Sequence, residues 1–361
     1  MKHTRNLYLI QTQPGFEAIA VQELQTRLQS ITIKSTHTLP GKNGMVLFRY
    51  TGNAQNLLQL RTVEDVFIVL ATIPELPHTY SALHSLRDAA IQLRLDTALP
   101  LVRQLSPGRG GRGKLRFRVV ARQVGQTNYR RMDAQRAIEK GLVAREDHRW
   151  QVAEDKALEF WLTLLPEQAF LALRLSDAQM RHRDEKIQHL PASLRPSTAA
   201  ALIWLTQPQP DDVFLDPMCG AGTILIERAQ TERYTLLLGG DISAEAIAAT
   251  HTNIGPRYKP IEIREWDART LPCDDGSITA AVVNLPFGKQ IGSADDNRSL
   301  YPAFLQEMAR VLRPTARFVV LTSDTRAFDM ALKRIRDFTR HEAYNVQVLG
   351  QQARVYVLER Q

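Results

Sequence analysis

The sequence predicts an α/β protein whose last domain is a doubly wound, mostly parallel sheet and whose earlier part is a basic α+β region. Three observations lead to this prediction. Apolar segments of strand and helix length alternate between residues 194 and 361. The earlier part mixes short strand and helix patterns and contains one strongly basic segment. The length of 361 residues also suits two or three domains better than one.

Residues 1–73 are predicted to form a small ferredoxin-like α+β domain. Strand and helix patterns follow one another there in a β-α-β-α-β order. The strands are expected at Leu7–Ile10, Gly44–Tyr50 and Val66–Ile73, and the helices from Pro14 to Leu28 and, capped by Asn53, as far as Leu60. The prolines at 74 and 77 are expected to end this domain, because proline interrupts both strands and helices.

Residues 74–180 are predicted to form a second domain that binds RNA. Basic residues far outnumber acidic ones between Arg103 and Arg149, and the whole chain has a formal net charge of +8. A solvated basic face is the alternative, but so local an excess favours contact with phosphates. Two apolar patterns that flank Pro166 predict a hairpin within this domain. The candidate RNA-binding residues are Arg109, Arg112, Lys114, Arg116, Arg122, Arg130 and Arg131.

A polar linker at residues 181–193 is expected to precede the last domain, residues 194–361. The linker lacks apolar periodicity, and a helix with Pro196 in its first turn follows it. Strand and helix patterns then alternate at Val213–Asp216, Thr223–Ala229, Leu236–Asp241, Glu245–Ile254, Ile261–Asp267, Ala280–Asn284, Tyr301–Leu312 and Arg317–Leu321, before an antiparallel pair at Asn345–Leu349 and Val355–Leu358.

Acidic residues end the first three strands of this domain, at the edge where open α/β sheets bind their ligands. Asp216 precedes a turn that contains Gly220 and Gly222, whose missing Cβ atoms let a ligand approach the backbone. Asp241 follows at about the spacing that places an acid on ribose hydroxyls. The turn lacks a third phosphate-binding glycine and a Gly-Lys-Ser/Thr sequence, so a cationic or zwitterionic ligand is favoured over a pyrophosphate.

A second motif, Asn284-Leu285-Pro286-Phe287, follows a later apolar strand. The Asn284 amide oxygen and a turn carbonyl can accept hydrogen bonds from the NH2 group of a planar base, while Phe287 stacks on the ring. Such acceptors favour the geometry in which the lone pair of the amine points at an electrophile. A strand-ending Asn beside a core Phe is the alternative, which the aspartates on the preceding strands make less favoured.

Together the two motifs resemble those of the S-adenosylmethionine-dependent amino-methyltransferases. The segments 216–223 and 284–288, with Leu194-Arg195-Pro196-Ser197 upstream, are most similar to the THUMP-domain RNA guanine-N2 methyltransferases. The resemblance covers essentially the whole chain and implies a ferredoxin-like domain, a THUMP RNA-binding domain and a Rossmann-like methyltransferase domain. It implies that S-adenosylmethionine contacts Arg195, Ser197, Asp216, Met218, Cys219, Gly220, Gly222, Thr223, Asp241, Ile242, Asp267, Ala268 and Asn284.

The same resemblance implies methyl transfer to the exocyclic N2 of a guanosine in tRNA, at position 6 of the acceptor stem, giving N2-methylguanosine. The catalytic residues it implies are Asn284, Leu285, Pro286 and Phe287. Leu285 replaces the first proline that is usual in amino-methyltransferases, which favours the branch that modifies tRNA guanine. An rRNA guanine-N2 methyltransferase, or a non-catalytic THUMP RNA-binding protein, is the alternative.

The cysteines and the distribution of apolar residues predict that the protein has no disulfide framework, metal site or membrane-spanning segment. Cys219 and Cys273 provide neither a disulfide framework nor metal-ligand spacing, so no metal is expected. The start of the chain lacks the apolar stretch of a signal peptide, and no apolar run approaches membrane-spanning length. We therefore expect a cytoplasmic protein without membrane contact, with a monomer favoured.

Overall fold

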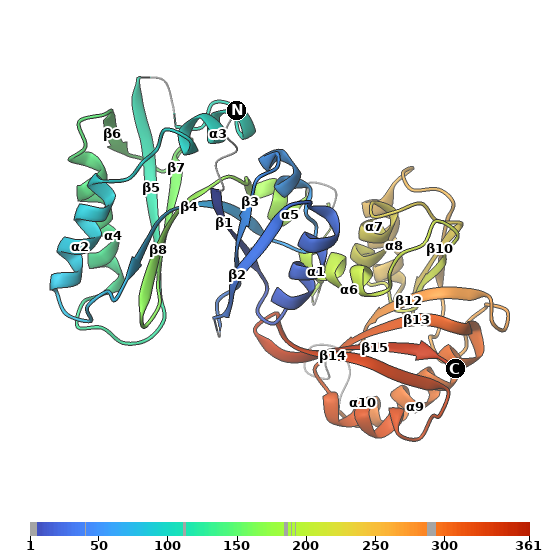
Figure 1. The fold of residues 1–361 in the computed structure, drawn as a ribbon. Helices are drawn as coiled ribbons and strands as arrows, with labels where there is room; N and C mark the ends of the chain where they lie inside the picture. Colours follow the sequence, from blue (N-terminus) through green and yellow to red (C-terminus); the bar gives the residue numbers. More distant parts are fainter. Residues whose placement is uncertain are drawn as a thin grey trace. The chain divides into compact units, whose positions relative to one another are not determined.

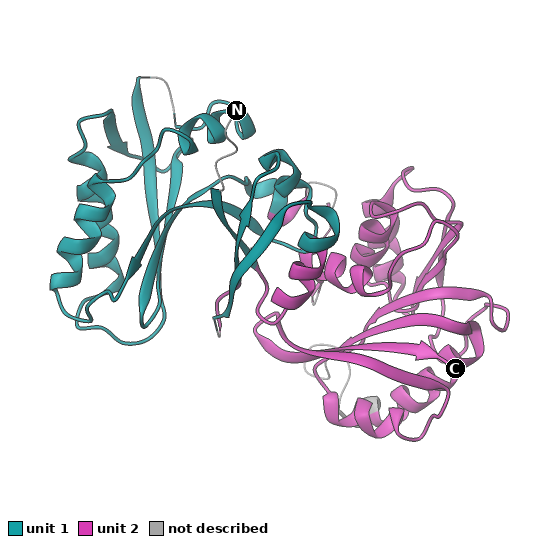
Figure 2. Cartoon of the chain, in the orientation of Figure 1, with its two compact units in different colours: residues 1–11, 24–39, 45–180 teal, residues 12–23, 40–44, 181–361 magenta. Residues whose placement is uncertain are grey.

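The computed structural model describes residues 6–39, 41–110, 113–183, 187–188, 190–191, 193–286 and 294–361 (Figure 1). The chain divides into two compact units (Figure 2). Unit 1 comprises residues 1–11, 24–39 and 45–180, and unit 2 comprises residues 12–23, 40–44 and 181–361. Part of the predicted N-terminal domain therefore belongs to the C-terminal unit.

Unit 1 is built on a mixed sheet with the strand order β2-β3-β1-β4-β8-β7-β5-β6. Its strands are β1 (Asn6–Thr12), β2 (Ile31–Thr38), β3 (Gly44–Tyr50), β4 (Asp65–Pro74), β5 (Lys114–Gln123), β6 (Arg149–Val152), β7 (Leu158–Leu164) and β8 (Gln168–Arg174). Antiparallel pairing joins β4 directly to β8, so the sheet runs on across the predicted boundary at residue 73. The helices of this half of the chain are α1 (Glu17–Arg27), the 3-10 helix η1 (Ala54–Gln59), α2 (Ser81–Ile91), α3 (Ala98–Leu105), α4 (Arg131–Val143) and α5 (Ala178–His182).

The N-terminal segment departs from the predicted β-α-β-α-β order at two places. The prediction omits β2, because Ile31–Thr38 has only two apolar residues and forms an edge strand on which every second side chain is exposed. Asn53 caps the following element as predicted, and its side chain accepts the Gln55 N–H at 3.0 Å, but the element is a 3-10 helix. The predicted hairpin around Pro166 is confirmed by the antiparallel pairing of β7 with β8.

Unit 2 contains the predicted doubly wound sheet, with the strand order β11-β10-β9-β12-β13-β15-β14. Its strands are β9 (Val213–Asp216), β10 (Leu236–Asp241), β11 (Ile261–Glu265), β12 (Ile278–Asn284), β13 (Leu312–Thr322), β14 (Phe338–Val348) and β15 (Gln351–Arg360), and its helices are α6 (Pro196–Leu205), α7 (Thr223–Ala229), α8 (Ala244–Ile254), α9 (Ala294–Val311) and α10 (Thr325–Leu332). The strands from β11 to β13 are parallel, whereas β15 and β14 are antiparallel, as predicted. The strand order reverses between the parallel neighbours β9 and β12, and open α/β sheets bind their ligands at such a switch point.

Both faces of this sheet are buried. Neighbouring residues of β9 enter different apolar clusters, because successive side chains of a strand point to opposite faces. Phe214 packs with Leu202 of α6 and Leu225 of α7. Leu215 lies instead in the cluster that contains Phe304 of α9 and Phe328 of α10. The apolar, nearly unbroken strand sequences reflect this double coverage.

The segment around α1 completes the core of unit 2. Phe16 and Ile19 are buried in the same cluster as Val346 and Val348 of β14. The carbonyl of Pro14 accepts the Gln347 N–H at 2.9 Å. Local sequence patterns do not reveal this contact, because more than 300 residues separate the partners along the chain.

The described residues contain neither a candidate membrane-spanning helix nor a candidate metal-binding cluster. None of the described helices combines the length and apolar character needed to cross a membrane. Within the same residues, no three His, Cys, Asp or Glu side chains gather in an arrangement that could hold a metal ion.

Candidate active site

Asp216 lies at the carboxyl end of β9, where the chain leaves the sheet. The side chain is completely buried, and within the described part of the chain no other side chain pairs with its carboxylate. Burial raises the pKa of this carboxyl well above its usual value. The Met218 backbone N–H offsets part of this shift, and the nearby Asp241 raises the pKa further. A buried carboxylate without a paired cation is costly, so this position suits a cationic ligand group.

The residues from Asp216 to Gly222, which we call the glycine loop, are held by contacts from several elements. Trp266 donates its indole N–H to the Pro217 carbonyl at 3.0 Å. The Cys219 N–H reaches the Gly240 carbonyl of β10 at 2.9 Å. The Thr250 and Asn253 side chains of α8 donate to the Gly220 and Ala221 carbonyls. The loop is therefore positioned by the protein alone, which is the condition for preorganised ligand binding.

Gly222 shows why this loop contains glycine. Its φ of +79° lies in the left-handed region, and it caps the amino end of α7. A Cβ there would come within 3.1 Å of the Thr250 side chain. Gly220 has a φ of +52°, and a Cβ at that position would meet nothing within 4 Å. The left-handed backbone conformation favours glycine at both positions. The open space beside Gly220 leaves room for a ligand.

Asp241, at the end of β10, supports the glycine loop through one of its carboxylate oxygens. One carboxylate oxygen accepts the Gly220 N–H at 3.0 Å, and the other accepts the Ser243 N–H at 3.0 Å. A carboxylate has about four acceptor positions, so capacity remains for the two hydroxyls of a ribose. The next residue, Ile242, is 69% exposed, which is unusual for isoleucine and leaves its side chain open to a ligand.

Asp267 follows β11 and is bound to Arg269. The Arg269 guanidinium contacts both carboxylate oxygens, at distances from 2.6 to 3.0 Å. This contact lowers the pKa of Asp267, so the carboxylate stays ionised. Ala268 beside it is buried. The sequence prediction for these two residues did not include the arginine.

Asn284 ends β12 beside β9. Its amide oxygen is buried and has no hydrogen-bond partner in the described part of the chain. Ala281 pairs with Leu215, so Asn284 lies two residues beyond the level of Asp216, about 7 Å along the strands. The structure thus brings the two predicted motifs to the same edge of the sheet.

The segment after Asn284 is tied to the core. The Leu285 N–H donates to the Leu321 carbonyl at 2.9 Å, and the Leu285 side chain is fully buried. The Tyr301 hydroxyl of α9 donates to the Pro286 carbonyl at 3.1 Å. Phe287, the predicted stacking residue, lies outside the described residues. Sequence reasoning missed Tyr301, because an aromatic residue in an apolar helix resembles any other core residue.

The other predicted cofactor residues lie at the start of α6, in the glycine loop and at the start of α7. Ser197 in the first turn of α6 is buried, and its hydroxyl has no partner within the described residues. Arg195, which precedes that helix, is exposed. Burial raises the pKa of the Cys219 thiol well above its usual value, so the thiol stays protonated. Met218 lies in the glycine loop, and Thr223 is the first residue of α7.

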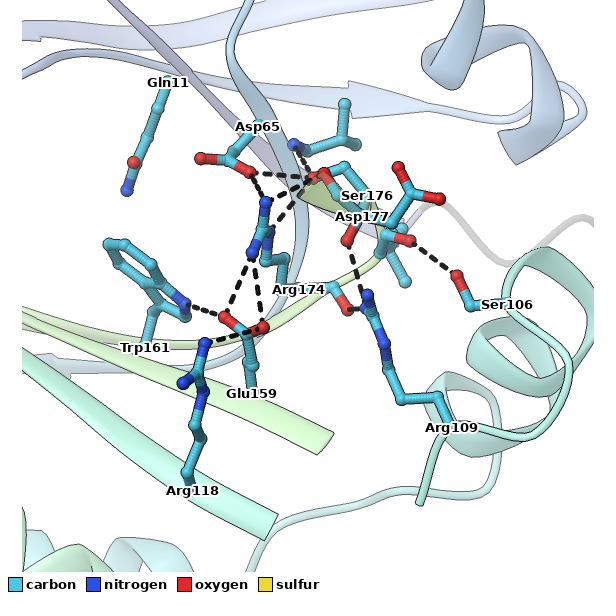
Figure 3. Close-up of polar contacts among 12 residues, drawn as sticks. Gln11, Asp65, Ser106, Arg109, Arg118, Glu159, Trp161, Arg174, Ser176 and Asp177 are labelled. Carbon is cyan, nitrogen blue, oxygen red and sulfur yellow. Dashed lines mark hydrogen bonds and ion pairs between the residues drawn. The ribbon is translucent and has the colours of Figure 1, made fainter. Parts of the chain in front are cut away.

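The predicted RNA-binding residues of unit 1 differ in their surroundings. Arg109 donates to the backbone carbonyls of Arg174 and Ser176, and burial lowers the pKa of its guanidinium (Figure 3). Arg122 lies over the Trp161 ring, 4.2 Å from its centroid. Arg112 lies outside the described residues. Lys114, Arg130 and Arg131 are exposed, whereas Arg116 is half-buried, as are Arg109 and Arg122.

Comparison with known proteins identifies the unit that carries these residues. Residues 183–354 match the RMKL-like methyltransferase domain. This segment is therefore similar to the methyltransferase domains of that family. The earlier resemblance to THUMP-domain guanine-N2 methyltransferases is confirmed by relatives that match over most of the chain.

Human tRNA (guanine(6)-N(2))-methyltransferase THUMP3 is 33% identical over 264 residues, which are 68% of this chain and 51% of the relative. The tRNA (guanine(6)-N2)-methyltransferase of Thermus thermophilus is 29% identical over 250 residues, or 68% and 72% of the two chains. Human U6 snRNA (guanine-N(2))-methyltransferase THUMPD2 is 34% identical over 136 residues, or 37% and 26%. The chain spans about half the length of the THUMP3 relatives that it matches.

A solved structure gives the same assignment of the fold. The crystal structure of TrmN from Thermus thermophilus superposes with a TM-score of 0.79 at 24% identity, covering 98% of this chain and 99% of that chain. This likeness extends beyond the methyltransferase domain and includes unit 1. It confirms the predicted fold class for the chain.

Proposed function

We propose that this protein transfers a methyl group from S-adenosylmethionine to N2 of a guanosine in tRNA, at position 6 of the acceptor stem. The observation that carries the proposal is a pair of buried acceptors, the Asp216 carboxylate and the Asn284 amide oxygen, at one edge of the sheet, which no other side chain of the described residues pairs. One acceptor suits a cation and the other suits an amine. Relatives that are 29% and 33% identical to this chain over the aligned residues are named for the same reaction.

The residues around the glycine loop fit S-adenosylmethionine. Asp216 would accept hydrogen bonds from the ammonium of the methionine part, and Asp241 from the ribose hydroxyls. Ile242 would pack on the adenine, and Asp267 with Ala268 would receive its amine. Arg195, Ser197, Met218, Cys219 and Thr223 would line the same site. When bound, this cofactor supplies a methyl group activated by a positively charged sulfur.

The Asn284 loop would hold the target guanine. A base-paired guanine cannot enter such a site, so the nucleotide must leave the helix and stack, as we propose, on Phe287. Asn284 and a loop carbonyl would accept the two N2 protons and direct the nitrogen lone pair at the methyl carbon. A nitrogen–carbon bond then forms as the sulfur–carbon bond breaks, and N2 releases one proton to solvent. Leu285 and Pro286 hold Asn284 in position through their contacts with the core.

The exposed basic residues of unit 1 would contact the RNA backbone. Lys114 and Arg116 lie on β5, and Arg130 and Arg131 lie at the start of α4. Phosphate contacts of this kind depend strongly on salt. Arg109 is a weaker candidate, because its guanidinium donates to main-chain carbonyls. We further propose that the protein acts in the cytoplasm and as a monomer.

The test is methylation of separate RNA classes. The chain would be incubated with labelled S-adenosylmethionine and with tRNA, rRNA or U6 snRNA, and the nucleosides would be analysed by mass spectrometry. We expect N2-methylguanosine in tRNA, lost roughly 10²- to 10⁴-fold in Asn284→Ala, with cofactor and RNA binding retained. Label in rRNA or U6 snRNA alone would refute the tRNA proposal. A wild-type chain that binds no cofactor by calorimetry would instead support a non-catalytic RNA-binding protein.

A further inference from the structure

Asn253 of α8 joins the glycine loop to the segment that leads into unit 2. Its fully buried amide nitrogen donates to the carbonyls of Ala221 and Gln188, both at 2.9 Å. Its amide oxygen accepts the backbone N–H groups of Ile187 and Gln188, at 2.9 and 2.7 Å. A primary amide has two donor hydrogens and two acceptor lone pairs, so these four bonds use its full capacity.

The glycine loop needs such side chains, because its own backbone cannot bind all of its carbonyls. Gly220 and Gly222 have left-handed conformations, which interrupt regular main-chain hydrogen bonding. The Gly220 carbonyl accepts the Thr250 hydroxyl at 2.6 Å, and the Ala221 carbonyl accepts Asn253. Thr250 and Asn253 are three residues apart on α8 and therefore share one face of the helix. Because the peptide unit is planar and trans, fixing a carbonyl also fixes the opposite direction of the next N–H.

Asn253 differs from Thr250 in what holds it. Both Asn253 acceptor bonds come from the linker peptide Ile187–Gln188, as does one of the two carbonyls that its nitrogen binds. Linker residue Arg183 also forms an ion pair with Glu227 of α7, the helix that starts at the end of the loop. The linker thus contacts both helices that flank the glycine loop.

We propose that Asn253 is a positioning residue for the cofactor and that the Ile187–Gln188 peptide holds it in the orientation that the loop requires. The linker then acts on the cofactor site indirectly: it binds Asn253, and Asn253 binds the glycine loop. Without the linker peptide, the Asn253 oxygen loses both donors and the amide can turn away from Ala221. The inference rests on the proposed function only for the identity of the cofactor.

The first test replaces the amide by a carboxylate of the same shape. Asn253→Asp keeps both acceptors but loses both donors, so a carboxylate oxygen faces the Ala221 and Gln188 carbonyls. We expect the Kd of S-adenosylhomocysteine, measured by calorimetry, to rise roughly 5- to 100-fold, while tRNA affinity stays unchanged. The matched control is Thr252→Ala on the exposed face of the same helix, whose hydroxyl bonds only within α8.

The second test changes the linker and leaves α8 intact. Gln188→Pro removes the N–H that lies 2.7 Å from the Asn253 oxygen, whereas Gln188→Ala keeps it. We expect weaker binding of S-adenosylhomocysteine for the proline variant alone. Hydrogen exchange of the ligand-free protein supplies a readout that does not depend on any cofactor: the backbone amides of residues 218–222 should exchange faster in Asn253→Asp and Gln188→Pro. Unchanged exchange in these folded variants overturns the inference. A wild-type chain that binds no S-adenosylhomocysteine, with exchange still faster in both variants, would refute the cofactor assignment and support the coupling of linker and loop.

Discussion

Buried carboxylates occur in both units, but Glu159 in unit 1 and Asp216 in unit 2 have opposite surroundings. Glu159 contacts two arginines: the Arg174 guanidinium at 3.2 Å and that of Arg118 at 3.1 Å (Figure 3). Burial alone would raise the pKa of the Glu159 carboxyl, yet the two arginines outweigh it and lower the pKa. Asp216 has no such partner in the described part of the chain, and its pKa is raised.

The difference separates a structural cluster from a binding site. Arg174 also pairs with Asp65 at 2.6 Å and donates to the Asp177 carbonyl at 2.9 Å, so the charges of this cluster compensate one another. Such a cluster fixes the end of β8 and the start of the chain segment that follows. Asp216 is equally buried, but no cation of the described residues compensates its charge. Burying such a charge costs folding free energy, and this cost is typical of sites where a ligand supplies the opposite charge.

The largest effect that tests this comparison is expected in unit 1. Arg174→Met removes the cation that Asp65 and Glu159 share and leaves two buried carboxylates with too few partners. We expect the free energy of unfolding to fall by about 3–5 kcal/mol, measured by denaturant titration of the full chain. Arg116→Met is the control, because the Arg116 pair with Asp155 is long, at 4.0 Å, and exposed, so less than about 1 kcal/mol should be lost. Equal losses would show that burial does not distinguish the two pairs.

In unit 2, replacing Asp216 should raise the free energy of unfolding, whereas Arg174→Met in unit 1 should lower it. Asp216→Asn removes a buried charge that no cation of the described residues compensates, so the ligand-free protein should become more stable at neutral pH. The variant should bind S-adenosylmethionine roughly 10- to 100-fold more weakly by calorimetry, because a charge-assisted hydrogen bond is lost. A variant that is less stable and binds normally would place Asp216 among the structural residues.

The two carboxyls should also respond to pH in opposite directions. The Asp216 pKa is raised on folding, so the folded state binds more protons and ligand-free stability falls as pH rises from the ordinary Asp range through the raised pKa. The Glu159 pKa is lowered, so its contribution is present above the ordinary Glu range and is lost as pH falls. The stability gained by Asp216→Asn should therefore grow with pH, whereas the stability lost in Glu159→Gln should shrink in acid. Parallel pH profiles for the two variants would contradict this account.

The sequence predicted those parts of the protein that depend on local patterns. Strand ends carry Asp216, Asp241 and Asn284, so the topology of a parallel sheet suffices to bring them to one edge. The sequence prediction missed edge strand β2 because this strand has few apolar residues. It also missed the packing of Phe16 on β14, because these residues are far apart along the chain.

The supporting residues of the site show a similar division. Thr250 and Asn253 are polar residues at buried positions on one helix face, a pattern that sequence reasoning could have used. For Arg109, charge and a glycine-rich neighbourhood favoured an exposed loop, whereas its guanidinium is used by main-chain carbonyls. Composition reports how many charges a segment has, but only packing decides which of them solvent reaches.

The smallest expected effect concerns Tyr301, which supports the Asn284 loop without reaching its unpaired oxygen. Burial raises the pKa of Tyr301 to about 12, so the hydroxyl remains a donor to the Pro286 carbonyl, and it also contacts the Thr322 hydroxyl at 3.1 Å. Tyr301→Phe should lower kcat roughly 5- to 50-fold while the KM for S-adenosylmethionine stays unchanged, because the loop loses one anchor of about 1–2 kcal/mol. Tyr356→Phe is the matched control: this tyrosine is equally buried in the same apolar cluster, and its hydroxyl contacts Arg354 instead of the loop. Both variants should lose similar stability in thermal unfolding. A kcat that falls equally in both would mean that general packing, and not the Pro286 contact, positions Asn284.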